Sequence, residues 1–345
     1  MRAVVTDGRG GLSPADLPAP EAPQDGALVR VVACGLCGSD LEKVCGPDAQ
    51  AGLVLGHEVV GWLERPDAEP VRVALAHHVP CGCCGACRTG HSSLCAQFTS
   101  TRLDPGGFAE SLAVSAVHLE DAVFPLPESV DDLAGTLLEP LSCVLRAFDV
   151  VKSLQRAFPI PAVGGRPPAP PWTWPGKVLV AGCGSVGLML LAVLASDTRR
   201  RPDQYLGPAC QGYYFLEPDP VRAGLAAGLG AVRLEEAGSV DVAIVTAPAA
   251  LPQVVASMAP GGIVVIFASR GATTDIDVDQ VYRRELTLAG VRSGSPTHLR
   301  RALELLSDGL LPLEWFRPVV VGLEELPAAF AEYAAGRSLK VVARP

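Results

Sequence analysis

The chain carries the stretch Lys177-Val-Leu-Val-Ala-Gly-Cys-Gly-Ser-Val-Gly-Leu-Met-Leu-Leu191, in which an apolar strand leads through a Gly-x-Gly-x-x-Gly turn into an apolar helix. In a dinucleotide site the first glycine makes the tight turn, the second lets the backbone approach the pyrophosphate, and the third allows close helix–strand packing. The N-terminus of the helix then faces the phosphate charge. Because a strand precedes the glycines and a helix follows them, the stretch predicts a nucleotide-binding unit. Its predicted cofactor-binding residues are Gly182, Gly184, Ser185, Val186 and Gly187.

Further strand-like runs alternate with helical segments after this stretch, which is typical of a parallel, doubly wound sheet. The runs are 213–217, 241–247, 262–267 and 286–290. We therefore expect a nucleotide-binding domain over residues 151–294. The proline-dense residues 155–176 cannot form a helix or a central strand, so we expect an extended surface connection there. The polar residues 196–212 are expected to loop out between helix and strand.

Cofactor choice depends on Glu217, which ends the predicted second strand. An acid there accepts hydrogen bonds from the adenosine ribose hydroxyls and repels a 2′-phosphate, so we expect NAD rather than NADP. Glu217 lies 35 residues after Gly182, farther than the usual ~20, and the looped stretch accounts for the excess. Alternatively, Glu217 only begins the Glu-Pro-Asp-Pro turn, and Arg222 on the following helix receives an NADP phosphate.

A cysteine-rich loop, Pro80 to Cys95, precedes this domain. Three of its cysteines stand three residues apart and a fourth follows after a short excursion, so one loop can present four sulfurs tetrahedrally. The spacing predicts a closed, structural zinc site and not a disulfide pair. Cys83 is surplus and is expected to point away from the metal, and His91 competes poorly with four thiolates. The predicted ligands are Cys81, Cys84, Cys87 and Cys95.

A second metal site is predicted from Cys37, in Cys34-Gly-Leu-Cys37-Gly-Ser-Asp40, and His57 some twenty residues later. A thiolate, an imidazole and a carboxylate converging with an open position are what a catalytic zinc needs. Either residue alone would more readily be a buried thiol or a core histidine. The third ligand stays open between Glu58 and Glu139, which lies in a predicted helix that begins at Leu133. In isolation Glu139 also fits a helix N-terminal carboxylate.

Composition restricts the class of protein. The 345 residues allow two domains, and 49% hydrophobic against 19% charged residues is a globular composition. The net charge of −9 argues against nucleic acid or an anionic membrane as partner, because both reward a basic face. The N-terminus is strand-like and no long apolar span is present, so we expect a soluble, cytoplasmic protein. The 11 cysteines then indicate metal ligands and reduced thiols.

The order of the motifs resembles the zinc-containing medium-chain dehydrogenase/reductase family over nearly the whole chain. That order is the Cys37 run, Gly56-His57-Glu58, the four-cysteine loop, Gly-Gly-Phe-Ala-Glu at 106–110, Glu139-Pro-Leu and the glycine fingerprint. It is closest to the polyol and threonine dehydrogenase branch, where Glu-Pro-Leu replaces a cysteine ligand. The resemblance implies an α/β protein with a β-rich GroES-like catalytic domain, residues 1–150 and 295–345, and a Rossmann domain. A helix at 296–307 and a closing strand at 339–343 match the C-terminal return.

The resemblance further implies a dehydrogenase that passes a hydride from a secondary alcohol to NAD. It implies two zinc ions per chain, with the catalytic one polarising the hydroxyl of a polyol, sugar derivative or amino alcohol, and a homodimer or homotetramer. By the family pattern Ser39 relays the hydroxyl proton and Asp40 orients the metal histidine. Where relatives often carry a proton-passing histidine this chain has Glu42, so we expect no histidine-like limb in pH–rate profiles from that position.

Two other functions are compatible with parts of this pattern. The chain could bind NAD(H) and zinc without turnover, as a sensor or scaffold. It could also be an NADP-linked reductase of activated double bonds, a role that does without catalytic zinc. The joint occurrence of Cys37, His57 and Glu58 argues against the second of these.

Overall fold

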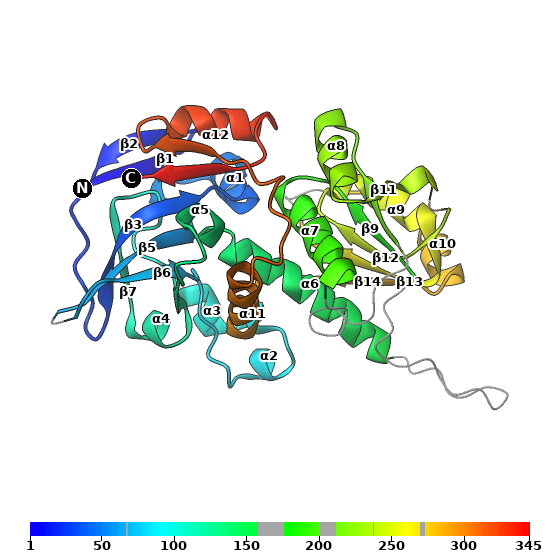
Figure 1. Ribbon diagram of the computed structural model, residues 1–345, viewed down its shortest axis with the longest axis horizontal. Coiled ribbons are helices and arrows are strands. Elements are labelled where there is room, and N and C mark those ends of the chain that lie inside the picture. Colours follow the sequence, from blue (N-terminus) through cyan, green and yellow to red (C-terminus); the bar gives the residue numbers. More distant parts are fainter. Residues whose placement is uncertain (67, 158–175, 201–211, 237, 270–272) are drawn as a thin grey trace. The chain divides into compact units, whose positions relative to one another are not determined.

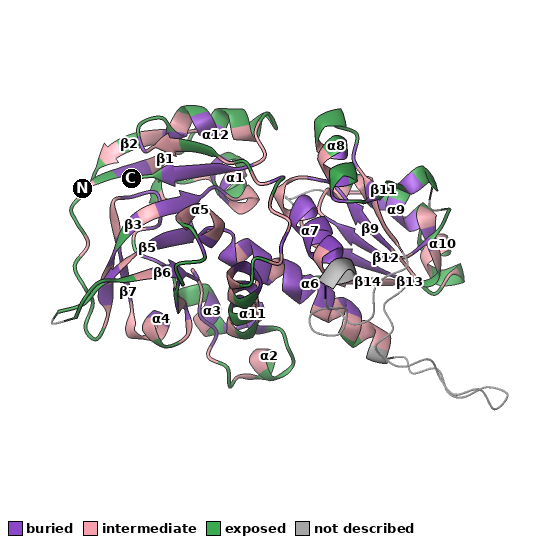
Figure 2. Ribbon diagram, in the orientation of Figure 1, coloured by how far each residue is buried: buried purple, intermediate pink, exposed green. Residues whose placement is uncertain are grey.

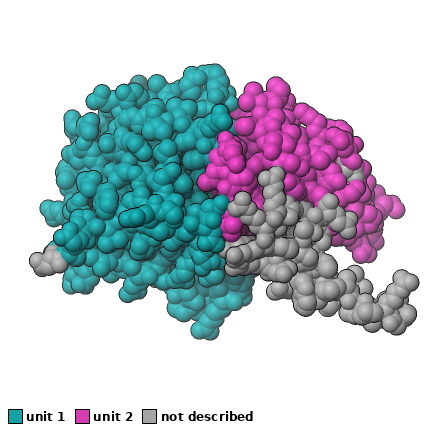
Figure 3. Space-filling model, in the orientation of Figure 1, with its two compact units in different colours: residues 1–143, 293–309, 316–345 teal, residues 144–292, 310–315 magenta. Residues whose placement is uncertain are grey.

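The computed structural model describes residues 1–66, 68–157, 176–200, 212–236, 238–269 and 273–345. The chain divides into two compact units (Figure 3). Unit 1 comprises Met1–Cys143, Ser293–Gly309 and Phe316–Pro345, and unit 2 comprises Val144–Arg292 and Leu310–Trp315. The first division therefore falls inside a helix, α6 (Leu138–Ala157), several residues before the expected position 150. Residues 310–315 return briefly to unit 2, and no pattern in the sequence predicts this return.

Unit 1 is built on two sheets. A three-stranded sheet has the order β2-β1-β4, and a seven-stranded sheet has the order β15-β16-β3-β5-β6-β8 with β7 also paired to β3 (Figure 1). The small sheet comprises β1 (Arg2–Asp7), β2 (Leu12–Asp16) and β4 (Ala51–Val54). The large sheet comprises β3 (Ala27–Gly35), β5 (Glu58–Glu64), β6 (Val71–Leu75), β7 (Ser111–Val114), β8 (Val123–Pro125), β15 (Val319–Gly322) and β16 (Val341–Arg344).

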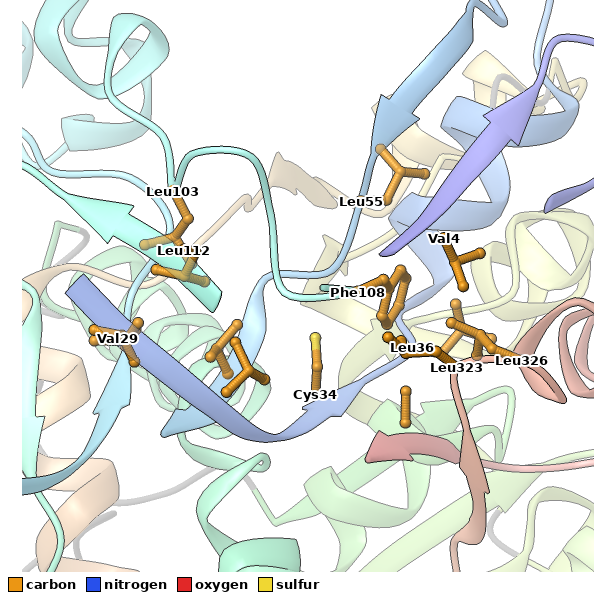
Figure 4. Close-up of a cluster of buried hydrophobic side chains, with 14 of the residues drawn as sticks. Val4, Val29, Cys34, Leu36, Leu55, Leu103, Phe108, Leu112, Leu323 and Leu326 are labelled. Carbon is orange, nitrogen blue, oxygen red and sulfur yellow. The ribbon is translucent and has the colours of Figure 1, made fainter. Parts of the chain in front are cut away.

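The helices of unit 1 are short, apart from the C-terminal ones. They are α1 (Gly38–Cys45), α2 (Gly85–Arg88), α3 (Ala96–Ser100), α4 (Ala116–Asp121), α5 (Asp132–Gly135), α11 (Pro296–Ser307) and α12 (Leu326–Ala334). Alternate residues of β3 are buried, as expected for a strand with one face on a core (Figure 2). The core cluster gathers the side chains of Val4, Cys34, Leu36 and Phe108 (Figure 4). Burial of these side chains anchors the end of β3, from which the chain enters α1.

Unit 2 contains one six-stranded sheet in which every pairing is parallel, with the order β11-β10-β9-β12-β13-β14. This is the doubly wound order, and the direction of winding reverses between β9 and β12. The strands are β9 (Lys177–Ala181), β10 (Gly212–Leu216), β11 (Val232–Arg233), β12 (Val240–Val245), β13 (Met258–Ile266) and β14 (Thr287–Gly290). Besides α6 the helices are α7 (Ser185–Arg200), α8 (Pro220–Gly228), α9 (Leu251–Ser257) and α10 (Val278–Arg283). The predicted fold class is confirmed.

Two local predictions were wrong. Helix α6 continues to Ala157, three residues into the stretch expected to be non-helical, because the first proline of that stretch is Pro159. Helix α7 likewise runs to Arg200, so the predicted loop at 196–212 begins as helix. The remainder of both stretches lies outside the described residues. None of the described helices combines the length and the apolar composition of a membrane span. The ten described cysteines form no disulfide.

Candidate active site and metal centres

The cysteine-rich loop brings four sulfurs together. Cys81, Cys84, Cys87 and Cys95 offer ligand atoms that lie within 4.8 Å of one another. The Sγ atoms of Cys84 and Cys87 are 3.6 Å apart, close to the ~3.8 Å edge of a tetrahedron with Zn–S bonds of about 2.3 Å. Backbone N–H groups of Cys83 and Cys84 donate to the Cys81 sulfur and lower the pKa of that thiol to about 6. The loop therefore fits a thiolate-binding metal such as zinc.

Replacing Cys95 by serine is expected to halve the zinc content and to lower the melting temperature by at least about 5 °C. The reason is that the loop has no apolar core of its own and depends on four thiolates for its structure. Zinc analysis and a thermal melt of the same preparation measure both effects. Cys45→Ser changes an exposed thiol outside the loop and serves as control. Normal zinc content and melting in Cys95→Ser would remove the structural site.

The second cluster begins where β3 passes into α1. Cys37, His57 and Glu58 offer ligand atoms within 4.8 Å of one another. Cys37 precedes the first residue of α1, and its backbone N–H donates to Asp40 Oδ2 at 3.0 Å. The other oxygen of this fully buried carboxylate, Oδ1, lies 3.3 Å from His57 Nδ1. Asp40 thus fixes the imidazole with Nδ1 turned to the carboxylate and Nε2 left for a metal.

Electrostatics at His57 favour a cation. Burial alone would lower the pKa of His57, but the charge and hydrogen bond of Asp40 hold it well above its ordinary value. The imidazole therefore favours an added positive charge, which either a proton or a metal ion on Nε2 supplies. Together with the thiol of Cys37 this is a donor set that suits zinc.

Glu58 is held by a cation from a distant part of the chain. Its Oε2 forms a buried salt bridge with Lys340 Nζ, which also donates to the carbonyl of Leu36 at 3.1 Å. Strand registers explain the meeting, because β3 lies between β16 and β5 and pairs Gly35 with both Val342 and Glu58. A Cβ at position 35 would overlap the Glu58 carboxylate, so glycine is required there. Glu58 therefore lies in the ligand cluster while the ammonium group of Lys340 balances part of its negative charge.

Glu139 approaches the same region from the first turn of α6. Desolvation raises the pKa of Glu139, and the charges of His57 and Glu58 act on it in opposite directions. One turn along the helix, the Cys143 thiol donates to its Oε1 at 3.4 Å. Glu139 lies outside the three-residue ligand cluster. Its carboxylate carries no salt bridge among the contacts of the described residues.

The two predicted relay residues of α1 occupy different positions. Ser39 is partly buried, and its Oγ lies 3.5 Å from His57 Nε2. Glu42 is exposed, and its backbone carbonyl accepts the N–H of Gly46 at the end of the helix. The structure therefore places Ser39 at the cluster and leaves the Glu42 side chain on the surface.

In unit 2 the three fingerprint glycines meet three different requirements. Gly182 has φ +95°, and a Cβ there would come within 2.7 Å of Ala247 Cβ. A Cβ at Gly187 would overlap the carbonyl oxygen of Gly182, so this glycine allows helix α7 to pack against the turn. A Cβ at Gly184 would have no atom within 4 Å, which leaves the backbone there open to a ligand. Ser185 and Val186, the other predicted cofactor-binding residues, form the first turn of α7.

Glu217 follows β10 directly and is buried. Its Oε2 accepts the backbone N–H of Cys183, in the glycine turn, at 2.7 Å, and its Oε1 accepts the N–H of Asp219 at 3.0 Å. The carboxylate thus both begins the predicted turn and lies against the nucleotide loop. Arg222 lies in the first turn of α8, where its backbone N–H is capped by Asp219 Oδ1 at 2.9 Å.

Comparison with known proteins agrees with this arrangement. Residues 23–128 match the alcohol dehydrogenase GroES-like domain, and these residues include Cys37, His57 and the cysteine-rich loop. The chain is 26% identical to L-threonine 3-dehydrogenase of Streptomyces avermitilis over 99% of its own length and 98% of that protein. The chain therefore contains an alcohol dehydrogenase GroES-like domain and is similar over most of its length to threonine and polyol dehydrogenases. It is a polyol/threonine dehydrogenase-like oxidoreductase that uses NAD or NADP.

Two solved dehydrogenases share this fold over the whole chain. An Escherichia coli CFT073 alcohol dehydrogenase complexed with NADH is 20% identical, with a TM-score of 0.78, and covers 100% of this chain and 99% of its own. A Sinorhizobium meliloti 1021 protein described as a zinc-binding dehydrogenase, bound to NADP, is 25% identical, with a TM-score of 0.76 and the same coverage. Both nicotinamide cofactors therefore occur among proteins with this fold.

Two residues that lie beside the cluster of Cys37, His57 and Glu58 were missed in the sequence. Lys340 lies 282 residues from Glu58, and only the strand registers bring the two together. His77 follows β6, and its ring centroid lies 5.9 Å from that of His57. Burial, followed by the neighbouring imidazoles, lowers the pKa of His77 to about 2, so this ring stays neutral beside His57. The Ala-His-His run after an apolar strand was the available signal for His77.

Proposed function

We propose that this chain is a zinc-dependent dehydrogenase that transfers a hydride from a secondary alcohol to NAD. The substrate class is a polyol, a sugar derivative or an amino alcohol, and the expected setting is the cytoplasm. The observation that supports this most is the convergence of Cys37, His57 and Glu58, with Asp40 behind the imidazole. The second zinc belongs to the cysteine-rich loop, and a homodimer or homotetramer is expected.

The roles of the residues follow from their contacts. Zinc held by Cys37, His57 and a glutamate would supply a Lewis acid that polarises the substrate hydroxyl. Asp40 keeps the imidazole in the tautomer that presents Nε2. Ser39 Oγ, beside that nitrogen, is placed to accept the hydroxyl proton and pass it on. In unit 2 the open backbone at Gly184 and the N-terminus of α7 would hold the pyrophosphate of the cofactor.

The third ligand of the catalytic zinc is proposed to be the carboxylate of either Glu58 or Glu139. Glu58 lies within the ligand cluster, but Lys340 holds one of its oxygens. Glu139 lies outside that cluster, and among the described residues the Cys143 thiol donates to its Oε1 while no salt bridge holds it. Zinc titrations of Glu58→Gln and Glu139→Gln distinguish them, because the variant that lacks the ligand loses zinc affinity and the other keeps it.

The main test measures metal content and turnover together. Two zinc ions per chain, NADH formation with a panel of polyols, amino alcohols and simple alcohols, and loss of that activity on chelation are expected. Zinc and NADH binding without turnover of any alcohol would instead support a sensor or scaffold. Turnover that survives complete removal of zinc would contradict the proposal.

Ser39→Ala is expected to lower kcat by about 10–100-fold, because it removes the hydroxyl that lies beside His57 Nε2. Glu42→Gln, on the exposed face of the same helix, is the matched control and is expected to change kcat by less than about twofold. Steady-state kinetics over a range of pH check both. A loss in Glu42→Gln as large as that in Ser39→Ala would make the carboxylate an essential base.

Glu217→Ser is expected to shift the NAD/NADP ratio of kcat/KM by at least about tenfold toward NADP, because the buried carboxylate no longer repels a 2′-phosphate. The wild type is expected to prefer NAD. Glu235→Ser, an exposed carboxylate in the same unit, is the control and should leave the ratio unchanged. A wild-type preference for NADP, or an unmoved ratio in Glu217→Ser, would exclude Glu217 from cofactor selection.

A further inference from the structure

The cysteine-rich loop holds a fifth thiol that a four-ligand zinc site does not use. Cys83 lies outside the group of four sulfurs that approach one another within 4.8 Å. Its side chain is exposed, and its Sγ donates a hydrogen bond to Cys81 Sγ at 3.7 Å. An exposed thiol is therefore in direct contact with one of the four ligands.

We propose that Cys83 is an oxidation site that converts a peroxide into a disulfide with the ligand Cys81, and this proposal rests on the structural zinc site proposed above. Gly82 joins the two cysteines with φ +71°, and a Cβ there would have no atom within 4 Å. This open left-handed turn brings the two sulfurs to the same side of the loop. A disulfide has sulfurs about 2.05 Å apart, so the sulfurs must approach by less than about 2 Å.

The other described thiols lack this combination of exposure and a sulfur partner. Cys45 is also exposed, but its Sγ donates to the carbonyl of Gly10 at 3.5 Å. Cys84 and Cys87 are 3.6 Å apart, but both are partly buried and both are ligands of the predicted zinc. Cys83 is thus the thiol of this loop that solvent reaches and that zinc does not protect.

The chemistry balances with a hydroperoxide as the oxidant. The Cys83 sulfur loses its proton and attacks one peroxide oxygen, so that an S–O bond forms, the O–O bond breaks and one water leaves. The Cys81 sulfur then attacks the Cys83 sulfur, an S–S bond forms, and hydroxide leaves and takes a proton from solvent. Two thiols lose two electrons, and hydrogen peroxide is reduced to two waters. The loop is left with three thiolate ligands and releases its zinc.

The experiment treats the full-length, zinc-loaded protein with hydrogen peroxide and follows zinc release with a chromogenic chelator. After alkylation of the remaining thiols, peptide fragmentation locates the disulfide. The wild type is expected to release one zinc per chain and to form the Cys81–Cys83 bond. Cys83→Ser should release zinc at least about tenfold more slowly, whereas Cys45→Ser, which also lacks an exposed thiol, should behave as the wild type.

The outcomes separate the two proposals. Untreated protein without zinc in the loop would mean that the structural site itself is absent. A zinc-loaded loop that forms Cys84–Cys87 or Cys81–Cys95 instead, or that releases zinc equally fast in Cys83→Ser, overturns the role of Cys83. If Cys83→Ser does not fold, the position of the disulfide in the wild type decides alone.

Discussion

Replacing His57 by alanine is expected to lower kcat/KM by at least about 10³-fold and to reduce the zinc content from two ions per chain to one. The physical reason is that Asp40 and Cys37 converge on a single imidazole, and the described residues place no second histidine in that ligand cluster. Loss of the imidazole leaves Cys37 and a carboxylate, which are too few to hold a catalytic metal. Metal analysis and steady-state kinetics on one preparation measure both effects.

The control is His91→Ala, which removes an exposed histidine beside the four cysteines of the cysteine-rich loop. His91 lies inside the cysteine-rich loop, but its Nδ1 pairs with the hydroxyl of Thr89 at 3.3 Å and it is outside the four-sulfur group. This variant is expected to keep two zinc ions and full activity. If His57→Ala retained both zinc ions and its turnover, the catalytic site would have to be sought elsewhere.

The second large effect is expected from Lys340→Met, which should lower the free energy of unfolding by about 3–5 kcal/mol. Lys340 and Glu58 are both almost fully buried, at 4% and 1% exposure, so water cannot replace the ammonium group once it is removed. Burial alone would lower the pKa of Lys340, but the charge of Glu58 holds it above its ordinary value. Urea denaturation measures the change.

Two further variants test whether the loss arises from the unpaired carboxylate. The double variant Lys340→Met/Glu58→Gln removes both charges and should recover much of the stability, because an isolated buried charge is the costly element. Arg337→Ala breaks an exposed ion pair with Glu332 and should hardly move the denaturation midpoint. An unchanged midpoint in Lys340→Met would mean that another cation balances Glu58.

The parts that could be predicted are those whose chemistry lies within a short stretch of chain. The glycine fingerprint places its turn and helix through backbone conformation at Gly182 and packing at Gly187, and both requirements are local. The four ligand cysteines lie close together because the loop from Cys81 to Cys95 is only fifteen residues long, which is too short to hold them far apart. Asp40 could be connected to His57 only through the family resemblance.

The ends of helices and the shortest strands were harder to predict, because they depend on weak local sequence signals. Helix α6 runs past the predicted domain boundary, since nothing between 143 and 157 breaks a helix before Pro159. The two-residue strand β11 and the edge strand β15 were not predicted, because short edge strands carry too little periodicity.

Spacing and residue type within short stretches were enough to predict that four cysteines of one loop come together, that the glycine turn leads into a helix, and that a thiol lies near an imidazole. The partners of the two carboxylates, in contrast, depend on the tertiary structure. Two strand pairings, β16 with β3 and β3 with β5, place Lys340 beside Glu58, whereas Glu139 on α6 receives a thiol. The reason is that the register of the sheet determines which charged side chains share a buried site. Lys340 and Glu58 are 282 positions apart, and no local sequence pattern predicts the register between such distant residues.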